Sequence, residues 1–430
     1  MHFVLNLLKM RLGNFLKRIS GKKIGRLDRK WVFDVNEQLL APPDVSEYEK
    51  GKYGIVYGTK DGKIYFLDEN AKLKWKFNIK EKVTDVDLFF MDEESSKSIY
   101  SRPVVHDINN DKRPEIIVGS DSGSIYVLNT NGKLLWSFKT GGPIRGSVLI
   151  ADINGDGKPE IIFGSMDKLL YVLDAKGKLL WKYKAKVEIE STPAYYEEGN
   201  MIIFGADDNY IRAIDTKGKL IWKFKTENKV LAQPAIGDIY NSNEDFIVIG
   251  SLDRFMYVLT MAGKLKWKYE TEGSIYSKAS LVDVNKDRQL EIIFGSCDDN
   301  VYVLTSNGNK LWSYETDFWV VDSPFVADID NDGKLEIVAG SYDHSLYVFD
   351  AEGAYLLNYV PGLSGVVQQQ GHYTDMLTSE PGQYHGKKLW QLETEGMIVG
   401  TAHFTDENNK EEIIVAVKKG KIDDLMHKID

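Results

Sequence analysis

The chain has 430 residues, of which 43% are hydrophobic and 27% charged, and its formal net charge at pH 7 is −10. Residues 1–30 hold nine Lys or Arg and one acid, so they carry +8 and the remaining 400 residues carry −18. An acidic body argues against a nucleic-acid groove, and we expect no nucleic-acid partner. The single cysteine, Cys297, excludes an intramolecular disulfide.

Residues 1–26 are predicted to form an amphipathic basic helix. Apolar side chains recur at helical spacing over residues 2–20, and the basic side chains lie mainly off that stripe. The stripe needs a surface to cover: the body of the chain, a partner protein or an anionic membrane surface. Asn6, Lys9 and Arg11 interrupt the apolar run, which makes it a poor secretory signal. No stretch of eighteen apolar residues occurs, so we expect no membrane span. With no export signal and no disulfide, we expect a cytoplasmic protein, with an extracellular or membrane-peripheral location as the alternatives.

Residues 27–430 are built from a repeat. Seven copies of a tryptophan motif such as GKLLWKY (177–183) occur, and most follow a second motif such as FGSMDKLLYVLD (163–174). In six units a glycine precedes the tryptophan by seventeen residues: Gly58 and Trp75, Gly119 and Trp136, Gly164 and Trp181, Gly205 and Trp222, Gly250 and Trp267, and Gly295 and Trp312. One unit spans about 45 residues and holds four short β-rich runs, which is the period of a propeller blade.

The tryptophans predict eight blades. Eight of the nine follow the repeat: Trp31, Trp75, Trp136, Trp181, Trp222, Trp267, Trp312 and Trp390. The last unit ends before its fourth strand, whereas LDRKWVFDV (27–35) has the pattern of a lone fourth strand. We therefore expect the N-terminal strand to complete the C-terminal blade. Two insertions are predicted, at 82–98 and at 351–385, and a loop as long as the second is a candidate recognition element.

Four units carry an acidic loop between the first and second strands. The loops are DINNDKRPE (107–115), DINGDGKPE (152–160), DVNKDRQLE (283–291) and DIDNDGKLE (328–336). Side-chain oxygens at loop positions 1, 3, 5 and 9, with the backbone carbonyl at position 7, would supply the ligands that Ca²⁺ takes. The predicted metal ligands are Asp107, Asn109, Asp111, Arg113, Glu115, Asp152, Asn154, Asp156, Lys158, Glu160, Asp283, Asn285, Asp287, Gln289, Glu291, Asp328, Asp330, Asp332, Lys334 and Glu336.

The alternative for these loops is simple turn formation, which Asp and Asn favour. Four loops in register, each closing with Glu, favour a cation, because carboxylates this close would otherwise repel each other. Gly157 and Gly333 permit a tight backbone at position six, where Lys112 and Arg288 stand in the other two loops. We expect the loops to lie away from the ring axis and the ion to be structural, so no catalytic residue is predicted.

The repeat resembles two related propeller families. An acidic loop followed by IIFGS is similar to the FG-GAP repeat of integrin-α-type propellers, in which such loops bind calcium. The stretch G-S-x-D-x-x-[IL]-Y-V-L-D-x-x-G-K-x-x-W resembles the tryptophan-docking repeat of quinoprotein-like (PQQ-like) propellers. The resemblance covers about 400 of the 430 residues. It implies an all-β, eight-bladed propeller, but propellers host many unrelated functions.

The families that the repeat resembles contain both enzymes and noncatalytic proteins. Quinoprotein dehydrogenases hold their cofactor against a disulfide of adjacent cysteines, which a chain with one cysteine cannot form. Noncatalytic relatives, such as the outer-membrane assembly propeller and integrin-like heads, bind proteins. We therefore predict a noncatalytic, calcium-binding propeller that acts as a protein-binding platform, scaffold or sensor subunit. Partners would dock on the N-terminal helix and on residues 351–385, and residues 2–20 could also meet a membrane surface. A quinoprotein-type oxidoreductase or other propeller enzyme, and a carbohydrate-binding surface module, are the alternatives.

Overall fold

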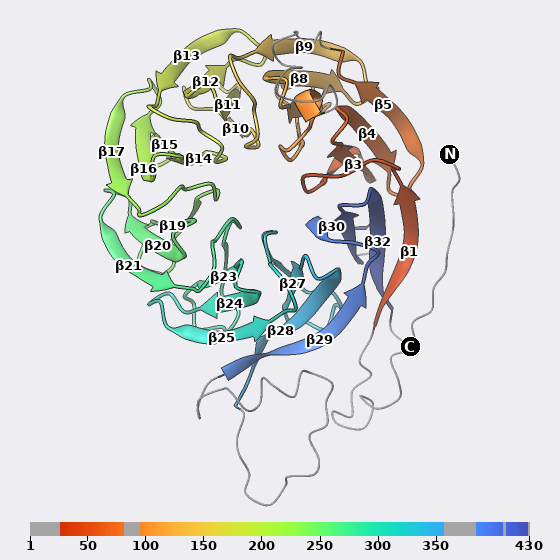
Figure 1. Ribbon diagram of the computed structural model, residues 1–430, viewed down its shortest axis with the longest axis vertical. Helices are drawn as coiled ribbons and strands as arrows, with labels where there is room; N and C mark the ends of the chain where they lie inside the picture. The colour runs from red at the N-terminus through yellow and green to blue at the C-terminus, as the bar shows by residue number, and fades with distance from the viewer. Residues whose placement is uncertain (1–25, 81–94, 357–383, 407–409, 429–430) are drawn as a thin grey trace, which may run out of the picture.

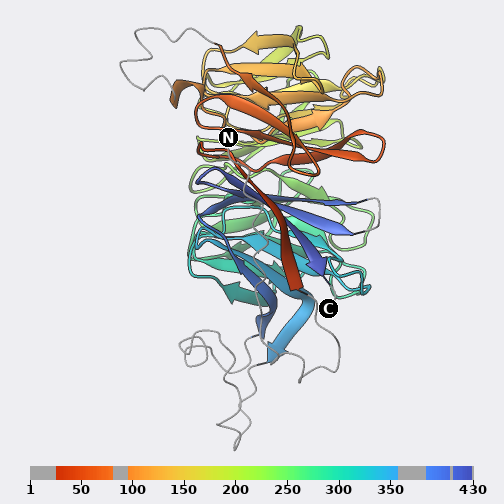
Figure 2. The same ribbon diagram turned by 90° about the vertical axis from the view of Figure 1, so that its right-hand side faces the viewer.

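The computed structural model describes residues 26–80, 95–356, 384–406 and 410–428. They form a ring of eight blades, each a four-stranded antiparallel sheet (Figure 1). Seen from the side, the ring is a thick disc (Figure 2). In these ranges one helical element occurs, the 3₁₀ turn Ser95–Lys97, and no helix is long and apolar enough to cross a membrane. The helix predicted for residues 1–26 falls almost entirely outside the described residues.

Each blade takes its four strands in order along the chain, except the last. Blades 1 to 4 comprise β2 (Asp44–Glu49), β3 (Lys52–Gly58), β4 (Lys63–Asp68) and β5 (Leu73–Asn78); β6 (Val104–His106), β7 (Glu115–Gly119), β8 (Ser124–Asn129) and β9 (Leu134–Lys139); β10 (Leu149–Ala151), β11 (Glu160–Gly164), β12 (Leu169–Leu173) and β13 (Leu179–Lys184); and β14 (Ala194–Tyr196), β15 (Met201–Ala206), β16 (Tyr210–Asp215) and β17 (Leu220–Lys225). Blades 5 to 8 comprise β18 (Ala235–Gly237), β19 (Phe246–Gly250), β20 (Phe255–Thr260) and β21 (Leu265–Glu270); β22 (Ser280–Val282), β23 (Glu291–Gly295), β24 (Asn300–Leu304) and β25 (Lys310–Glu315); β26 (Phe325–Ala327), β27 (Glu336–Gly340), β28 (Ser345–Leu356) and β29 (Tyr384–Glu393); and β30 (Ile398–Thr405), β31 (Glu411–Val417), β32 (Lys421–Lys428) and β1 (Arg26–Asp34).

The burial of each strand follows from its place in the blade. After its first residue the second strand is an apolar run, as in β11, and all five of its residues, Glu160 included, are buried between neighbouring blades. The fourth strand alternates, as in β13, where Trp181 and Tyr183 are half-buried while Lys182 and Lys184 are exposed. A continuous apolar run predicts a strand that is buried on both faces, as the second strand is. Alternation predicts a strand that is buried on one face, as the fourth strand is.

The tryptophans of the fourth strands dock on the next blade. Six of the eight indoles contact a glycine in the turn before the neighbouring fourth strand, or at its start: Trp75 on Gly132, Trp136 on Gly177, Trp181 on Gly218, Trp222 on Gly263, Trp267 on Gly308, and Trp312 on Gly386. The Trp136 Nε1 also donates to the carbonyl of Ala175 in that turn, at 3.1 Å. These tryptophans therefore pack between neighbouring blades.

The two ends of the chain close the ring in one blade. Strand β1 pairs antiparallel with β32, with Phe33 opposite Ile422 and Trp31 opposite Asp424. The Trp31 Nε1 donates to the carbonyl of Glu69 in blade 1 at 3.2 Å. The N-terminal strand therefore supplies the fourth strand of blade 8, which confirms both the predicted closure and the eight blades.

The first and last residues of the predicted insertion at 351–385 belong to regular β-strands. Strands β28 and β29 stay paired as far as Leu356 opposite Tyr384, so the described ends of the insertion lengthen a hairpin of blade 7. Strand β29 also makes a parallel bridge to β25, Ser313 opposite His385, which joins blades 6 and 7 into one sheet. Residues 357–383, and 81–94 of the other insertion, lie outside the described residues.

The first strand of each blade lies at the axis and the fourth at the rim (Figure 1). Innermost strands of neighbouring blades contact each other, as β10 does β14 and β14 does β18. We call one face of the disc the connector face: it holds the connections from each fourth strand to the next first strand, with the turns between second and third strands. The opposite, loop face holds the loops between first and second strands.

The acidic loops leave the innermost strands, on the loop face. Loop 152–160, for example, joins β10 to β11. Our expectation that these loops lie away from the axis is therefore wrong. The sequence identifies which strands a loop joins, but the distance of a strand from the axis depends on how the blades pack together.

Candidate functional site

The four acidic loops share one hydrogen-bonded backbone. In loop 152–160 the Asp152 carboxylate accepts the backbone N–H groups of Asp156 (3.2 Å) and Gly157 (2.7 Å). The Asn154 Oδ1 accepts the Asp156 N–H at 2.8 Å, and Asp156 accepts the N–H of Lys158 at 2.9 Å. Oxygens at positions 1, 3 and 5 thus hold the turn, while equivalent bonds recur in the other three loops.

The backbone at position six is left-handed in all four loops. Gly157 and Gly333 have φ values of 80° and 83°, and Lys112 and Arg288 adopt 67° and 72° without the freedom of glycine. A left-handed residue with a side chain costs about 1–2 kcal/mol. The hydrogen bonds of the loop therefore impose the same turn whether or not glycine is present. Glycine at position six is thus no criterion for which of the four loops can adopt this backbone.

The glutamate at position nine is turned inward in each loop. Glu160 is buried, and its Oε2 accepts the backbone N–H of Ile153 at 3.0 Å. In three loops the second oxygen accepts the side-chain amide of the Asn at position three: Asn109 to Glu115 at 2.7 Å, Asn154 to Glu160 at 2.7 Å, and Asn285 to Glu291 at 3.0 Å. Burial is the main reason that the pKa values of Glu115 and Glu291 rise to about 7.

Loop 328–336 departs from its siblings at position three, where Asp330 replaces the Asn. A carboxylate has no amide to donate, so Glu336 keeps the Ile329 N–H at 2.9 Å but lacks the second donor that its siblings have. Burial chiefly, with the charges of Asp330, Asp328 and Asp332, raises the pKa of Glu336 to about 8. Burial and the charge of Asp332 also raise the pKa of Asp330.

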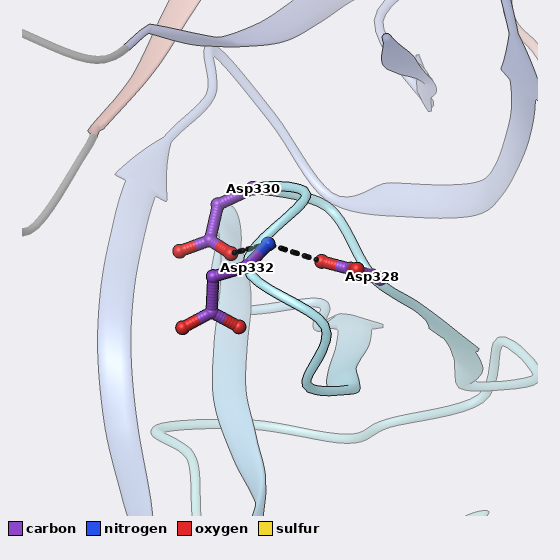
Figure 3. A group of neighbouring side chains, drawn as sticks. All are labelled: Asp328, Asp330 and Asp332. Carbon is purple, nitrogen blue, oxygen red and sulfur yellow. Dashed lines mark hydrogen bonds between the residues drawn. The ribbon is translucent and has the colours of Figure 1, made fainter. Parts of the chain in front are cut away.

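Only this loop gathers three acids among the parts of the chain that the structure describes. One carboxylate oxygen from each of Asp328, Asp330 and Asp332 lies within 4.8 Å of the others (Figure 3). The backbone N–H of Asp332 donates to Asp328 at 3.0 Å and to Asp330 at 3.1 Å, which fixes the three side chains on one turn (Figure 3). Three carboxylates at this spacing fit a divalent cation with oxygen ligands. Calcium in any of the four loops stays a prediction.

A second surface was missed by the sequence reasoning. The exposed large apolar residues of the described chain fall into two groups. One lies at the start of the outer strands: Leu134, Leu135, Leu179, Leu180, Leu220, Ile221 and Leu265. The other lies in connectors on the connector face, where Tyr100, Tyr276, Phe318 and Trp319 are each 40–43% exposed. Trp319 is the one tryptophan outside the repeat, and that irregularity was the available signal.

The exposed aromatics belong to a connector face held by ion pairs. The Arg145 guanidinium makes two bonds of 3.1 Å to Asp121 and lies over the Tyr100 ring, 5.0 Å from its centre. The rings of Phe318 and Trp319 stack with centroids 5.2 Å apart. Such contacts restrict the conformations of these side chains.

Four of the connectors are also anchored by an aspartate of the turn beside them. Asp253 accepts the backbone N–H of Glu227 in the preceding connector at 2.8 Å and the hydroxyl group of Tyr257 at 2.7 Å. Three other blades repeat this pairing: Asp167 with Tyr171, Asp298 with Tyr302, and Asp343 with Tyr347. The Asp of the G-S-x-D motif therefore ties the connector between two blades to the second of them.

The lone thiol is not set up as a nucleophile. Cys297 is half-buried, and burial, then the charges of Asp298 and Asp299, raise its pKa to about 11. A thiol with a raised pKa stays protonated at neutral pH, whereas nucleophilic cysteines have lowered pKa values.

Comparisons with known proteins support the propeller fold. A family model described as "Beta-alanine-activating enzyme, beta-propeller" matches residues 95–427. The crystal structure of BamB from Moraxella catarrhalis superposes with a TM-score of 0.63 at 15% sequence identity, and the alignment covers 94% of this chain and 99% of that chain. No curated protein matches the sequence. At that identity the likeness to BamB shows the fold alone, and it fits the propeller expected from the quinoprotein-like repeat.

Proposed function

The chain belongs to the family described as the beta-propeller of the beta-alanine-activating enzyme, and from that premise we propose that it is a noncatalytic propeller that binds another protein on its connector face. The ring supplies a rigid support, and the partner contacts the side chains that project from the connectors. The loop face contributes stability through its acidic turns rather than chemistry.

The observation that carries the proposal is the set of exposed aromatics on the connectors. Tyr100, Tyr276, Phe318 and Trp319 lie in segments that need no exposed ring to complete a blade, yet each is 40–43% exposed. Tyrosine, tryptophan and arginine are the residues enriched among the energetic centres of protein interfaces. The same features fit protein binding better than catalysis, because within the described part of the chain no nucleophile or base with the neighbours that catalysis requires accompanies them.

We further propose that calcium binds to the acidic loops and stabilises the ring. The repulsion among Asp330, Asp332 and Glu336 makes loop 328–336 the first candidate, because a divalent cation removes it. In the other three loops an Asn side-chain amide donates to the glutamate, so a bound cation would stabilise these loops less. The ion would have a structural role here, and no step of a reaction depends on it.

The segments outside the described residues extend the proposal. Residues 2–20 and the 351–385 insertion remain proposed docking elements for a protein partner, with a membrane surface as the alternative target of residues 2–20. A cytoplasmic location is likewise proposed. Affinity capture with and without residues 1–26 tests the first of these: if both forms retain the same proteins, residues 1–26 are not a docking element.

The connector face is tested by a matched pair of double variants. F318S/W319S removes two exposed rings from the connector face, and L180S/I221S removes two comparably exposed apolar side chains from the outer strands. Both should fold with the stability of the wild type. In affinity capture from the native source, proteins held by the wild type and by L180S/I221S should be lost from F318S/W319S. Equal capture by both variants would show that partners bind elsewhere.

The noncatalytic part of the proposal has its own test. Purified protein is mixed with PQQ and Ca²⁺ and assayed with a redox dye against alcohols and sugars. We expect no turnover above that of the heat-unfolded protein. Dye reduction that depends on PQQ and on the folded chain would make this propeller an enzyme.

A further inference from the structure

Two adjacent exposed rings of the connector face, Phe318 and Trp319, lie in a single connector. This is the segment 316–324, which joins β25 of blade 6 to β26 of blade 7, and the two rings stack with centroids 5.2 Å apart. The exposed ring of Tyr100, by contrast, lies under the Arg145 guanidinium at 5.0 Å. Within the described ranges, no Lys or Arg lies over Phe318 or Trp319.

The surroundings of these two rings are acidic. Turn 296–299 is hydrogen-bonded to the connector on one side and turn 341–344 on the other. The three segments contain no Lys or Arg and five aspartates: Asp298, Asp299, Asp317, Asp322 and Asp343. In each of the four preceding connectors, taken with its two flanking turns, the acids are accompanied by two Lys or Arg. The exposed ring pair and the unmixed negative charge therefore occur in the same connector.

Hydrogen bonds hold three of these aspartates beside the ring pair. The Asp343 carboxylate accepts the backbone N–H of Asp317, the residue before Phe318, at 2.9 Å. On the other side, the carbonyl of Asp299 accepts the N–H of Thr316 at 2.6 Å. Asp299, Asp317 and Asp343 are thus tied to the two residues that precede the rings.

The aspartates leave this part of the connector face with a net negative charge. Burial, and then the charges of three neighbours, raise the pKa of Asp299: Asp298, Asp343 and Asp317. One side-chain oxygen of Asp299 is buried and accepts no hydrogen bond within the described part of the chain. Asp317 and Asp343 also act on Lys388 of β29, a half-buried lysine whose charge offsets part of theirs.

We propose that Phe318 and Trp319 bind a basic side chain, Lys or Arg, of the protein that docks on the connector face. This inference rests on the proposed function and adds the chemistry of the partner: a basic segment with apolar residues beside the charge. The cation would lie over an exposed ring, within the field of the carboxylates of Asp299, Asp317 and Asp343. Its apolar stem would cover the rest of the ring pair.

A basic side chain suits both parts of this surface. The face of an aromatic ring attracts a cation, and a carboxylate forms charge-assisted hydrogen bonds with it. Arg suits the surface best, because its planar guanidinium stacks on a ring while its N–H groups donate to carboxylates. The same negative charge repels nucleic acid and anionic membranes, so it discriminates among classes of partner.

Residues 1–25 are also basic, but they join the ring at its other face. A fourth strand runs from the loop face to the connector face, because it leads into a connector. Strand β1 is the fourth strand of blade 8, so its first residue, Arg26, lies toward the loop face. A separate protein is therefore the occupant that the structure favours.

The first test uses the free protein. D299N/D317N removes two charges and keeps the shape of both side chains, and blade 4 already has an Asn, Asn209, at the position of Asp299 with the same left-handed backbone (φ of 66° and 68°). The control E197Q/E227Q removes two exposed acids elsewhere, one of them at the position of Asp317 in an earlier connector. Neither double variant should lower the midpoint of thermal unfolding. A lowered midpoint for D299N/D317N alone would show that the fold requires these charges, and would contradict the proposal.

The second test uses peptides as probes of the full chain. Acetyl-Leu-Arg-Leu-amide should bind the wild type and E197Q/E227Q equally in ligand-observed NMR, and should bind D299N/D317N and F318S/W319S at least about fivefold more weakly. Added salt should weaken the binding, because it screens the charges. The citrulline analogue, which keeps the shape of Arg without its charge, should not bind. Equal binding of the two peptides, or of the Arg peptide to D299N/D317N and wild type, would overturn the site.

A third arm separates the sources of the cation. If spermidine binds as tightly as the Arg peptide, the ligand is a small polyamine and its assignment to a partner protein is wrong. If the full chain carrying K17S/R18S binds the peptide more tightly than the wild type, residues 1–25 compete for the site and the occupant is this chain's own segment. Unchanged binding by K17S/R18S, with weak binding of spermidine, supports a partner protein.

Affinity capture separates this inference from the proposed function. If D299N/D317N loses the peptide while F318S/W319S keeps every partner, the cation site stands and the aromatic docking face does not. If F318S/W319S loses its partners while D299N/D317N keeps both peptide and partners, the docking face stands and this inference fails. Loss of the same partners from both variants, but not from E197Q/E227Q, supports both.

Discussion

The indole of Trp136 in blade 2 lies so close to Gly177 in blade 3 that a Cβ on the glycine would stand 2.6 Å from the ring atom Cε3. Gly177 also has a φ of +80°, which side chains rarely adopt. One residue therefore meets two independent requirements, a left-handed turn and a close approach, and the pair repeats around the ring. Glycine is required there by contact as well as by conformation.

Gly177→Ala should therefore destabilise the protein more than a left-handed backbone alone explains. The strain of the backbone and the displaced indole together predict a loss of about 2–4 kcal/mol in the free energy of unfolding. Gly51→Ala is the matched control, because its φ is +72° and no atom lies within 4 Å of the added Cβ, so about 1 kcal/mol is expected. Urea unfolding measures both. Equal losses would mean that the indole moves aside at little cost.

Removing the hydroxyl group of Tyr257 tests the connector anchors. Tyr257→Phe deletes one of the bonds to Asp253 while keeping the ring, and a hydrogen bond to a charged group contributes about 1.5–3 kcal/mol. Tyr210→Phe is the control, since the Tyr210 hydroxyl group makes no hydrogen bond within the described ranges. We expect a loss of that order for Tyr257 and almost none for Tyr210 in urea unfolding. Hydrogen exchange at Glu227 should also quicken only in Tyr257→Phe.

Asp322 should make stability depend on pH. Its Oδ2 accepts the N–H and the hydroxyl group of Thr401, both at 2.7 Å, and burial raises its pKa to about 6 from 3.8. Because the pKa is higher in the folded protein, the folded state holds the proton more tightly. The stability from this group is therefore complete below the unfolded value of 3.8 and is lost as pH rises through about 6.

Asp322→Asn keeps an acceptor for Thr401 and cannot ionise. We expect the variant to match the wild type near about pH 4 and to be more stable at about pH 7, by about 1–3 kcal/mol. Urea unfolding of both proteins at several pH values gives the difference, in which the other buried acids cancel. A variant that is less stable than the wild type at neutral pH would show that Asp322 is stabilised as the anion.

Exchanging one atom at loop position three should shift calcium dependence between loops. Asp330→Asn restores the amide donor that Glu336 lacks, so without calcium it should stabilise the protein by about 1 kcal/mol. The same variant should gain less than the wild type when calcium is added after chelation. Asn154→Asp is the reciprocal change in loop 152–160: it should lower the midpoint of thermal unfolding in chelator and increase the gain from calcium. If calcium changes neither the wild type nor Asn154→Asp, the acidic loops are turns without an ion.

The fold was predictable because its signals are local and repeated. The seventeen-residue step from glycine to tryptophan reflects two requirements within one blade, the tight packing at Gly164 and the docking of Trp181, and both recur with every unit. The closure followed from counting strands at the two ends. The described part of the 351–385 segment was harder to predict, because β28 and β29 lengthen by pairing with each other and no repeat marks where that pairing stops.

The site was predictable only in part. The repeated nine-residue motif identified the acidic loops, but the direction of the Asn154 amide depends on the buried Glu160 that it meets. The difference that Asp330 makes therefore appeared only in three dimensions.

Because the N-terminal strand completes the C-terminal blade, the ring can close only after the last strand has been synthesised. Among the described strands, β1 is synthesised first and its partner β32 last. Until then β1 is an exposed edge, and the seam between blades 8 and 1 cannot form. Contacts between such distant parts of a chain form slowly, and unpaired edges are where β proteins aggregate. A nascent chain stalled before β32 would therefore be a ring held open at one seam, with a tryptophan-bearing strand free to pair with another molecule.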